Sequence, residues 1–408
     1  MLSVESAAKK RASRRRIGLA LAGGGPLGSF YQLGALHALT ECIDGLDLCS
    51  LRGYVGVSSG AILCACLANG LSTDEIIRSF LLDDESARFP LAPGLLMRPA
   101  IGEYASRVAR IPELLGQIAA QCARDPLRQN WASALSPLLE AIPTGVFDNR
   151  PFARYLHEVL TSEGRTDDFR KLPCMLRVVA TELDSGSEAR FGEPELDHVP
   201  ISEAIRASTA LPGLYTPVRI EGRTYVDGAL LRTAHASLVL DQGADLVISI
   251  NPLVTFDGTT QRLGRSRTLA ERGFVAVMNQ TFRALIQSRM QVGMARYHEL
   301  YPSSDRLLLQ PNRNDKAMFF ANVFRYRDRC RLAEHAYQCT RRDLKRHARE
   351  LQPMLVRHGL GLRAERLNDR SRKILAGTSN AAGAPQQVFA RLDRTLARLS
   401  DLLQDAKA

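Results

Sequence analysis

Short apolar runs alternate with segments of helical pattern over the first two thirds of the chain. The runs at residues 17–22, 54–57 and 246–250 are short and almost uniformly apolar, which is typical of strands buried on both faces of a parallel sheet. A helical pattern follows the first run at residues 29–41. Strands that alternate with helices predict a three-layer α/β/α domain over residues 17–255.

The rest of the chain has a different character. Residues 72–145 are mostly helical and predict a cap inserted into the α/β domain, with a proline-broken apolar loop at 89–97 that is either a buried connection or a lid. Residues 256–375 predict a helical, Arg-rich extension. A linker of small residues follows at 376–387, and the apolar spacing over 388–408 predicts an amphipathic terminal helix.

The formal net charge of +11 is concentrated at the two ends of the chain. Residues 1–16 carry +5 and residues 331–408 carry +8, so the middle is close to neutral. We predict a disordered basic tail over residues 1–16. Basic ends suit an anionic membrane or nucleic acid, and solvated surfaces are an equal alternative. With 6% aromatic residues and no recognition motif, nucleic acid is not expected as a partner.

The cysteines and the N-terminal segment bear on the compartment. Eight cysteines are scattered without a C-x-x-C pair, which predicts reduced thiols and neither a disulfide framework nor a zinc site. The basic residues up to Arg16 precede an uncharged run to Thr40, as in an export signal, but the run contains six glycines and a polar middle. No stretch is long and apolar enough to span a bilayer. We therefore predict a cytoplasmic protein.

The most informative motif is Gly56-Val57-Ser58-Ser59-Gly60, which has the pattern G-x-S-x-G. An apolar run precedes it and a helical pattern follows, as in a nucleophile elbow. In such a turn, glycines on both sides relieve backbone crowding and one serine hydroxyl is raised above the sheet. The motif predicts Ser58 as the nucleophile of an acyl-transfer reaction.

A glycine-rich loop follows the first strand. Its pattern, Gly23-x-Gly25-x-x-Gly28, also matches the dinucleotide-binding fingerprint, which likewise joins a strand to a helix. A dinucleotide site would have an acidic residue at the end of the next strand, where this chain has Ser58. Consecutive glycines expose backbone N–H groups, which also suits an oxyanion hole. The loop alone leaves both interpretations open.

A serine nucleophile requires a base, and none of the eight histidines is an obvious partner. His235 is a weak candidate because it follows Asp227 by eight residues. Asp227, in Val226-Asp227-Gly228-Ala229 at the end of an apolar strand, is a better one. A turn aspartate without function is the alternative for this residue taken alone.

The three motifs, in this order, resemble the patatin-like phospholipase family over roughly residues 17–255. The segments 179–183 and 207–212 resemble the family as well. The resemblance implies that Ser58 is the nucleophile and Asp227 the proton acceptor of a Ser–Asp dyad. It further implies an oxyanion hole formed by the backbone amides of Gly23, Gly24 and Gly25. The positions that support the three motifs are Gly28, Gly56, Gly60, Gly228 and Ala229.

The function that this resemblance implies is hydrolysis of fatty-acyl esters of lipids, of the phospholipase A or lysophospholipase type, with no metal or organic cofactor. The substrate would be a phospholipid or another acyl-ester lipid, and the protein would contact anionic membranes peripherally. Because aspartate is a weak base, we expect a pocket that raises the basicity of Asp227 and excludes water. The alternatives are an acyltransferase with the same dyad and a non-enzymatic basic protein that binds membranes or nucleic acid.

Three positions depart from the pattern of the family. Leu27 stands two positions after Gly25, the third of the consecutive glycines, where members of the family commonly carry a basic residue. Thr233 and His235 stand where many members have asparagine and proline. Another group must therefore orient the glycine loop, or activity is reduced.

Overall fold

The computed structural model of the chain describes most of its residues, in seven ranges. They are 1–7, 16–82, 88–124, 136–231, 235–259, 268–320 and 328–375. Residues 1–370 form one compact unit and residues 371–408 belong to a second. The predicted linker at 376–387 and the predicted terminal helix at 388–408 lie outside the described residues.

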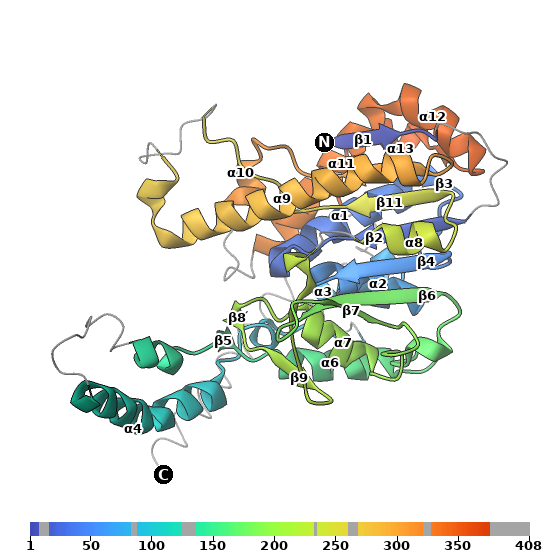
Figure 1. Cartoon of the computed structure of the whole chain (residues 1–408). Helices are drawn as coiled ribbons and strands as arrows, with labels where there is room; N and C mark the ends of the chain where they lie inside the picture. Colours follow the sequence, from blue (N-terminus) through green and yellow to red (C-terminus); the bar gives the residue numbers. More distant parts are fainter. Residues whose placement is uncertain are drawn as a thin grey trace, which may run out of the picture. The chain divides into compact units, whose positions relative to one another are not determined.

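A mixed sheet forms the centre of the first unit and has nine strands within the described residues (Figure 1). Its order is β1 (Leu2–Glu5), β12 (Asp305–Leu309), β11 (Leu246–Ile250), β2 (Ile17–Leu21), β4 (Gly53–Val57), β6 (Met175–Glu182), β10 (Arg223–Asp227) and β9 (Val218–Ile220), and β7 (Glu188–Phe191) pairs with β6. The five strands from β12 to β6 are parallel, and the outer strands are antiparallel. Parallel strands end at the same edge, so this arrangement gathers the segments that follow them.

Helices cover both faces of the sheet, so the predicted three-layer α/β/α architecture is confirmed. α2 (Ser59–Ala68) and α7 (Ile201–Ser208) pack on one face, with α1 (Gly25–Cys42) against α2. Every residue of α2 is buried, as expected for a helix that is apolar all round. α8 (Ser237–Asp241) and α9 (Phe274–Leu300) lie on the other face. Among the described residues, no helix combines the length and hydropathy needed to cross a membrane.

The segment between α2 and β6 includes the cap expected at residues 72–145 and continues to residue 171; we call the whole segment 72–171 the cap. It contains α3 (Thr73–Phe80), η1 (Pro93–Leu95), α4 (Ile101–Arg124), η2 (Ser136–Ala141), β5 (Gly145–Phe147), α6 (Arg150–Leu160) and η3 (Phe169–Lys171). β5 pairs with β8 (Gly213–Tyr215), which ties the cap to the main unit. In Figure 1, α4 and η2 extend away from the sheet.

The C-terminal third is mostly helical, as its composition predicts. It contains η5 (Ala270–Arg272), α10 (Lys316–Phe319), α11 (Arg329–Arg346), α12 (Ala348–Arg357), β13 (Gly361–Leu362) and α13 (Ala364–Asn368); β13 pairs with β3 (Ile43–Asp44). α11 packs closely on α1, where a Cβ atom on Gly34 would lie 2.1 Å from the carbonyl oxygen of Ala333. The backbones can approach this closely only because Gly34 has no side chain.

The sheet extends beyond the range that the sequence predicts. Residues 2–5, expected in a disordered tail, form β1 at the edge of the sheet, and β12 lies inside the sheet next to β11. The partner of β1 is 300 residues away, and Glu5 pairs with Arg306 at 2.8 Å. A four-residue strand beside a basic run carries too weak a local signal for the sequence to reveal this pairing.

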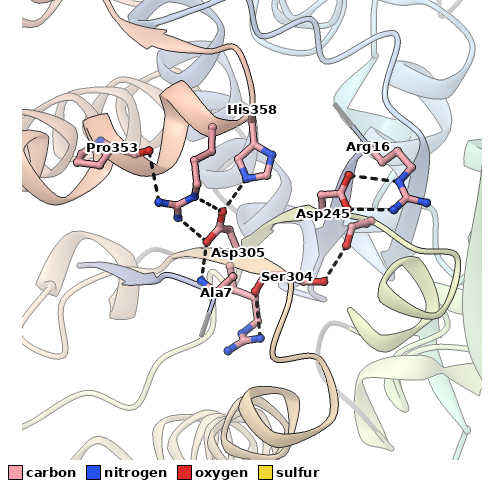
Figure 2. A network of polar contacts seen from close by, with 10 residues as sticks. Ala7, Arg16, Asp245, Ser304, Asp305, Pro353 and His358 are labelled. Carbon is pink, nitrogen blue, oxygen red and sulfur yellow. Dashed lines mark hydrogen bonds and ion pairs between the residues drawn. The ribbon is translucent and has the colours of Figure 1, made fainter. Parts of the chain in front are cut away.

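Asp305, at the start of β12, joins three distant parts of the chain (Figure 2). Its carboxylate accepts hydrogen bonds from the backbone N–H of Ala7 at 2.7 Å, from Arg357 at 2.8 Å and from His358 at 2.7 Å. Burial alone would raise the pKa of Asp305, but the hydrogen bonds from His358 and Arg357 outweigh it and hold this pKa below its ordinary value. The carboxylate therefore attaches Ala7 and the C-terminal end of α12 to the start of β12.

We expect Asp305→Asn to destabilise the chain by about 3 kcal/mol at neutral pH, because a buried ion pair loses one partner. Since folding lowers the pKa of Asp305, its contribution is present above the ordinary aspartate pKa of about 3.9 and is lost as the pH falls through the folded value. The difference between variant and wild type in urea unfolding should therefore shrink in acid.

Asp44→Asn is the matched control, because Asp44 pairs with Arg363 at 2.7 Å on the exposed surface. It should cost less than about 1 kcal/mol. An equal effect of the two substitutions would contradict the role of Asp305.

Candidate active site

Ser58 lies in the turn between β4 and α2, with the strained backbone of a nucleophile elbow. Its φ is 52° and its ψ is −124°, a conformation that costs a non-glycine residue about 1–3 kcal/mol. The turn is tight because a Cβ atom on Gly56 would lie 2.3 Å from the Cα of Ala61, and one on Gly60 would lie 2.4 Å from the carbonyl oxygen of Leu21. The predicted strand–turn–helix context of Ser58 is thus present.

Ser208, at the end of α7, holds this turn in place. Its hydroxyl accepts a hydrogen bond from the backbone N–H of Ser58 at 2.8 Å and donates one to the carbonyl oxygen of Val179 at 2.6 Å. All three groups are buried. The sequence gives Ser208 only as part of a segment resembling the family, because this contact spans 150 residues and no local pattern marks it.

Asp227 ends β10, and the side chain of Ser58 lies near enough to its carboxylate to influence the pKa of that group. One carboxylate oxygen also accepts the backbone N–H of Ala229 at 2.9 Å. The side chain is buried, and burial raises the pKa of Asp227 to about 6, with the Ser58 side chain and the Ala229 N–H opposing the rise. The residue is thus a stronger base than an exposed aspartate, as the sequence-based argument expects.

The glycine loop lies next to Ser58. A Cβ atom on Gly23 would come within 3.2 Å of the Cβ of Ser58 and 2.9 Å of that of Ala229. Gly24 is the N-cap of α1, and Gly25 is its first residue, with a φ of 61°. The first N–H groups of a helix have no partner within it and favour negative charge. The N-terminus of α1 therefore begins at a loop that packs against Ser58.

An apolar pocket opens from this site. It has a volume of about 570 Å³, counting space open to solvent. Side chains of the glycine loop, the cap and the segment after α7 line it. They are Gly25, Pro26, Ser29, Phe30, Ser58, Ser59, Ile62, Phe80, Leu91, Leu96, Asn149, Phe152, Thr209, Leu211, Leu214 and Tyr215.

Two polar atoms in the pocket wall have no hydrogen-bond partner among the described residues. They are the Ser59 hydroxyl and the Asn149 amide oxygen, both on buried residues. The Asn149 amide nitrogen donates to the carbonyl oxygen of Arg206 at 2.8 Å and to the Thr209 hydroxyl at 3.3 Å. Because Arg206 offers only an acceptor there, the amide orientation is fixed and its oxygen is left for a donor in the pocket.

The positions that depart from the family pattern have different environments. Leu27 is buried and supplies no cation to the glycine loop. His235 is buried with a φ of 46°, and its Nδ1 lies 3.1 Å from Glu188, so its charged neighbour is this glutamate. Thr233 lies outside the described residues. The structure thus pairs Ser58 with Asp227, while His235 pairs with Glu188.

A strained serine, an adjacent buried carboxylate and a glycine-rich helix N-terminus at the carboxyl edge of a largely parallel sheet are features of α/β serine hydrolases. The family model described as patatin-like phospholipase matches residues 19–239, more than half of the 408 residues. The chain belongs to the patatin-like phospholipase family.

Similar proteins are distant. An uncharacterised NTE-family protein of Mycobacterium bovis is 35% identical over 81 residues, 20% of this chain and 21% of that protein, so the match spans about a fifth of the curated relative. VipD of Legionella pneumophila is 18% identical, with a TM-score of 0.38 over 85% of this chain and 70% of that one. Human GIVD cytosolic phospholipase A2 is 11% identical, with a TM-score of 0.32 over 84% and 60%.

We expect Ser208→Ala to slow the reaction of Ser58 with a fluorophosphonate at least about tenfold, because the elbow loses the hydroxyl that fixes it. The variant also leaves the buried N–H of Ser58 unsatisfied, which costs about 1–3 kcal/mol of stability. Labelling rates and urea unfolding would measure the two effects.

Ser202→Ala is the matched control, because Ser202 is a buried serine of the same helix whose hydroxyl donates to Asp167 at 2.7 Å. It should lose comparable stability and keep the labelling rate of wild type. Equal slowing in both variants would show that Ser208 affects only folding.

Proposed function

We propose that the chain is a serine lipid acyl hydrolase that cleaves fatty-acyl esters of phospholipids or lysophospholipids. The observation that carries this proposal is the approach of the Ser58 side chain to the buried carboxylate of Asp227, beside the glycine loop and in the wall of an apolar pocket. Family membership supports the same reaction class.

The reaction begins when the Ser58 oxygen forms a bond to the ester carbonyl carbon and the hydroxyl proton passes to Asp227. The carbonyl electron pair moves to oxygen, and the amides of Gly23, Gly24 and Gly25 stabilise this oxyanion. Collapse of the intermediate expels the alcohol, which takes the proton from Asp227. Water then attacks the acyl-serine and loses a proton to Asp227. When the second intermediate collapses, the bond from the acyl carbon to Ser58 breaks, the fatty acid is released, and Asp227 returns the proton to the Ser58 oxygen.

The pocket accounts for the class of substrate. Its wall is mostly aliphatic and aromatic, so it favours a hydrocarbon chain over a polar acyl group. A chain in the pocket would also exclude water from Ser58, which lines the pocket beside the buried Asp227. The free oxygen of Asn149 and the hydroxyl of Ser59 can bind a polar group near the ester, such as a hydroxyl of the leaving alcohol.

Labelling with a fluorophosphonate tests the proposal. Wild type should form a covalent adduct at Ser58, while Ser58→Ala should not react and Asp227→Asn should react at least about a hundredfold more slowly, because the base is lost. Ser106→Ala, in the exposed part of α4, is the control and should react like wild type. Undiminished labelling of Ser58→Ala would refute the assignment.

The pH dependence of the same labelling reaction identifies the base. A protonated Asp227 cannot accept the Ser58 proton, so the rate should fall about tenfold per unit below its pKa of about 6 and level off above about pH 7. A histidine-dependent reaction would keep its profile in Asp227→Asn. Release of free fatty acid from lysophospholipid, with glycerol present and absent, would separate hydrolysis from acyl transfer.

The cap offers a surface for contact with lipid, which we include in the proposal. Six of the thirteen exposed large hydrophobic side chains in the described part of the chain lie between residues 101 and 146. Three of these six side chains lie on α4 and belong to a stripe of exposed apolar residues spaced alternately four and three positions apart. The stripe consists of Ile101, Ala105, Val108, Pro112, Leu115 and Ala119. Such a stripe on a helix suits the interface of a bilayer.

The segment that precedes this stripe in the sequence lines the pocket. Leu91 and Leu96 line the pocket just before α4 begins, and the Tyr215 hydroxyl donates to the carbonyl oxygen of Leu96 at 2.8 Å. Arg88 and Arg98 are exposed at the same lip and suit anionic headgroups. A lipid that leaves the bilayer at the cap would therefore reach Ser58 by an apolar path.

We expect Val108→Asp combined with Leu115→Asp to reduce hydrolysis of vesicle phospholipid at least about tenfold, because two charges replace the apolar stripe. Hydrolysis of a soluble short-chain ester should remain unchanged, since neither residue lines the pocket. Val356→Asp, at an equally exposed position of α12, is the control. A parallel loss on both substrates would contradict a role in membrane contact.

A further inference from the structure

Asp315, His335 and Cys339 converge outside the pocket. Each of the three offers one atom that could bind a metal ion, and these three atoms all lie within 4.8 Å of one another. Within the described part of the chain this is the group of three or more His, Cys, Asp or Glu side chains that meets this limit. His335 Nε2 lies 2.7 Å from a carboxylate oxygen of Asp315 and 3.6 Å from the sulfur of Cys339. One nitrogen therefore faces both anionic groups.

The backbone fixes all three side chains. His335 and Cys339 are four residues apart on α11, so they share one face of a rigid helix. Asp315 is the N-cap of α10, and its other carboxylate oxygen accepts the backbone N–H of Met318 at 3.2 Å. The cap leaves the oxygen near His335 available as a ligand and holds it in place.

We propose that Asp315, His335 and Cys339 bind one divalent transition-metal ion of the zinc type. An imidazole, a thiolate and a carboxylate are ligands that zinc accepts, and their charges neutralise a dication. Tetrahedral zinc requires about 3.5 Å between nitrogen and sulfur ligands and about 3.3 Å between nitrogen and oxygen ligands. The distance of 3.6 Å from His335 Nε2 to the Cys339 sulfur already meets this requirement. The Asp315 oxygen, at 2.7 Å from the same nitrogen, would have to move away by about 0.6 Å.

The surroundings suit such an ion. His335 and Cys339 are partly exposed, so water can supply a fourth ligand. The guanidinium of Arg342, one turn further along α11, donates to the Cys339 sulfur at 3.0 Å, which supports the thiolate form that a metal requires. The ion would join α10 to α11 and stabilise the segment after β12.

This site departs from the expectation of no zinc site, which rested on the absence of a C-x-x-C pair. The sequence contains the signal His335-x-x-x-Cys339, but the third ligand lies 20 residues earlier on a separate element. The proposal is independent of the proposed lipase chemistry, because none of the three residues lines the pocket.

Titration of the chelator-treated full chain with cobalt tests the proposal, because cobalt bound to a thiolate has a charge-transfer band. Wild type should bind about one ion per chain with this band and unfold at a higher temperature with zinc. His335→Ala and Cys339→Ser should lose the ion, and Cys339→His should keep it without the charge-transfer band.

Cys330→Ser is the matched control on the same helix and should bind cobalt like wild type. Circular dichroism melts would verify that each variant is folded. Absence of cobalt binding in wild type, or binding that persists with its band in Cys339→Ser, would overturn the proposal.

Discussion

The left-handed backbone at Ser58 is the constraint on which the site depends. Contacts with the residues packed around this turn must offset its backbone strain, and these residues belong to several elements of the fold. Gly60 lets α2 approach Leu21 of β2, Gly56 lets the turn close, and Ser208 binds the Ser58 N–H from α7. The sheet must therefore bring β2, β4 and α7 together before the serine hydroxyl can project towards Asp227.

The same packing accounts for the chemistry of Asp227. Its pKa rises because β10 pairs with β6 and buries the carboxylate at the end of the strand, while only the Ser58 side chain and the Ala229 N–H oppose the rise. A carboxylate with three or four donors would remain a weak base. In the mechanism that we propose, sparse hydrogen bonding in a buried site would allow this aspartate to take the place of the histidine that serine hydrolases commonly use.

Local features of this fold could be predicted from the sequence, whereas long-range ones could not. The buried strands, the turn at Ser58 and the position of Asp227 at the end of a strand depend on neighbouring residues and were recognisable. The strand at residues 2–5, the contact of Ser208 with Ser58 and the approach of Asp315 to His335 join residues that are 20 to 300 positions apart. Only the folded chain brings such residues together, and a single serine or aspartate in a helical segment carries no mark of its partner.

Leu27 raises the question of what holds the glycine loop where a cation is expected. The structure offers an apolar support instead. A Cβ atom on Gly24 would lie 2.4 Å from the ring of Pro252, and one on Gly28 would lie 3.0 Å from it, so this ring rests directly against the loop. Pro252 follows β11, and the same connection carries Phe256, whose ring stacks on Phe319 of α10 at 4.8 Å.

The loop is therefore braced from β11 and α10. A rigid ring against bare glycine backbone restricts the loop by shape alone, and a buried leucine at position 27 is compatible with that kind of support. α10, which lies in the predicted helical extension at 256–375, thus packs on the same connection that carries Pro252.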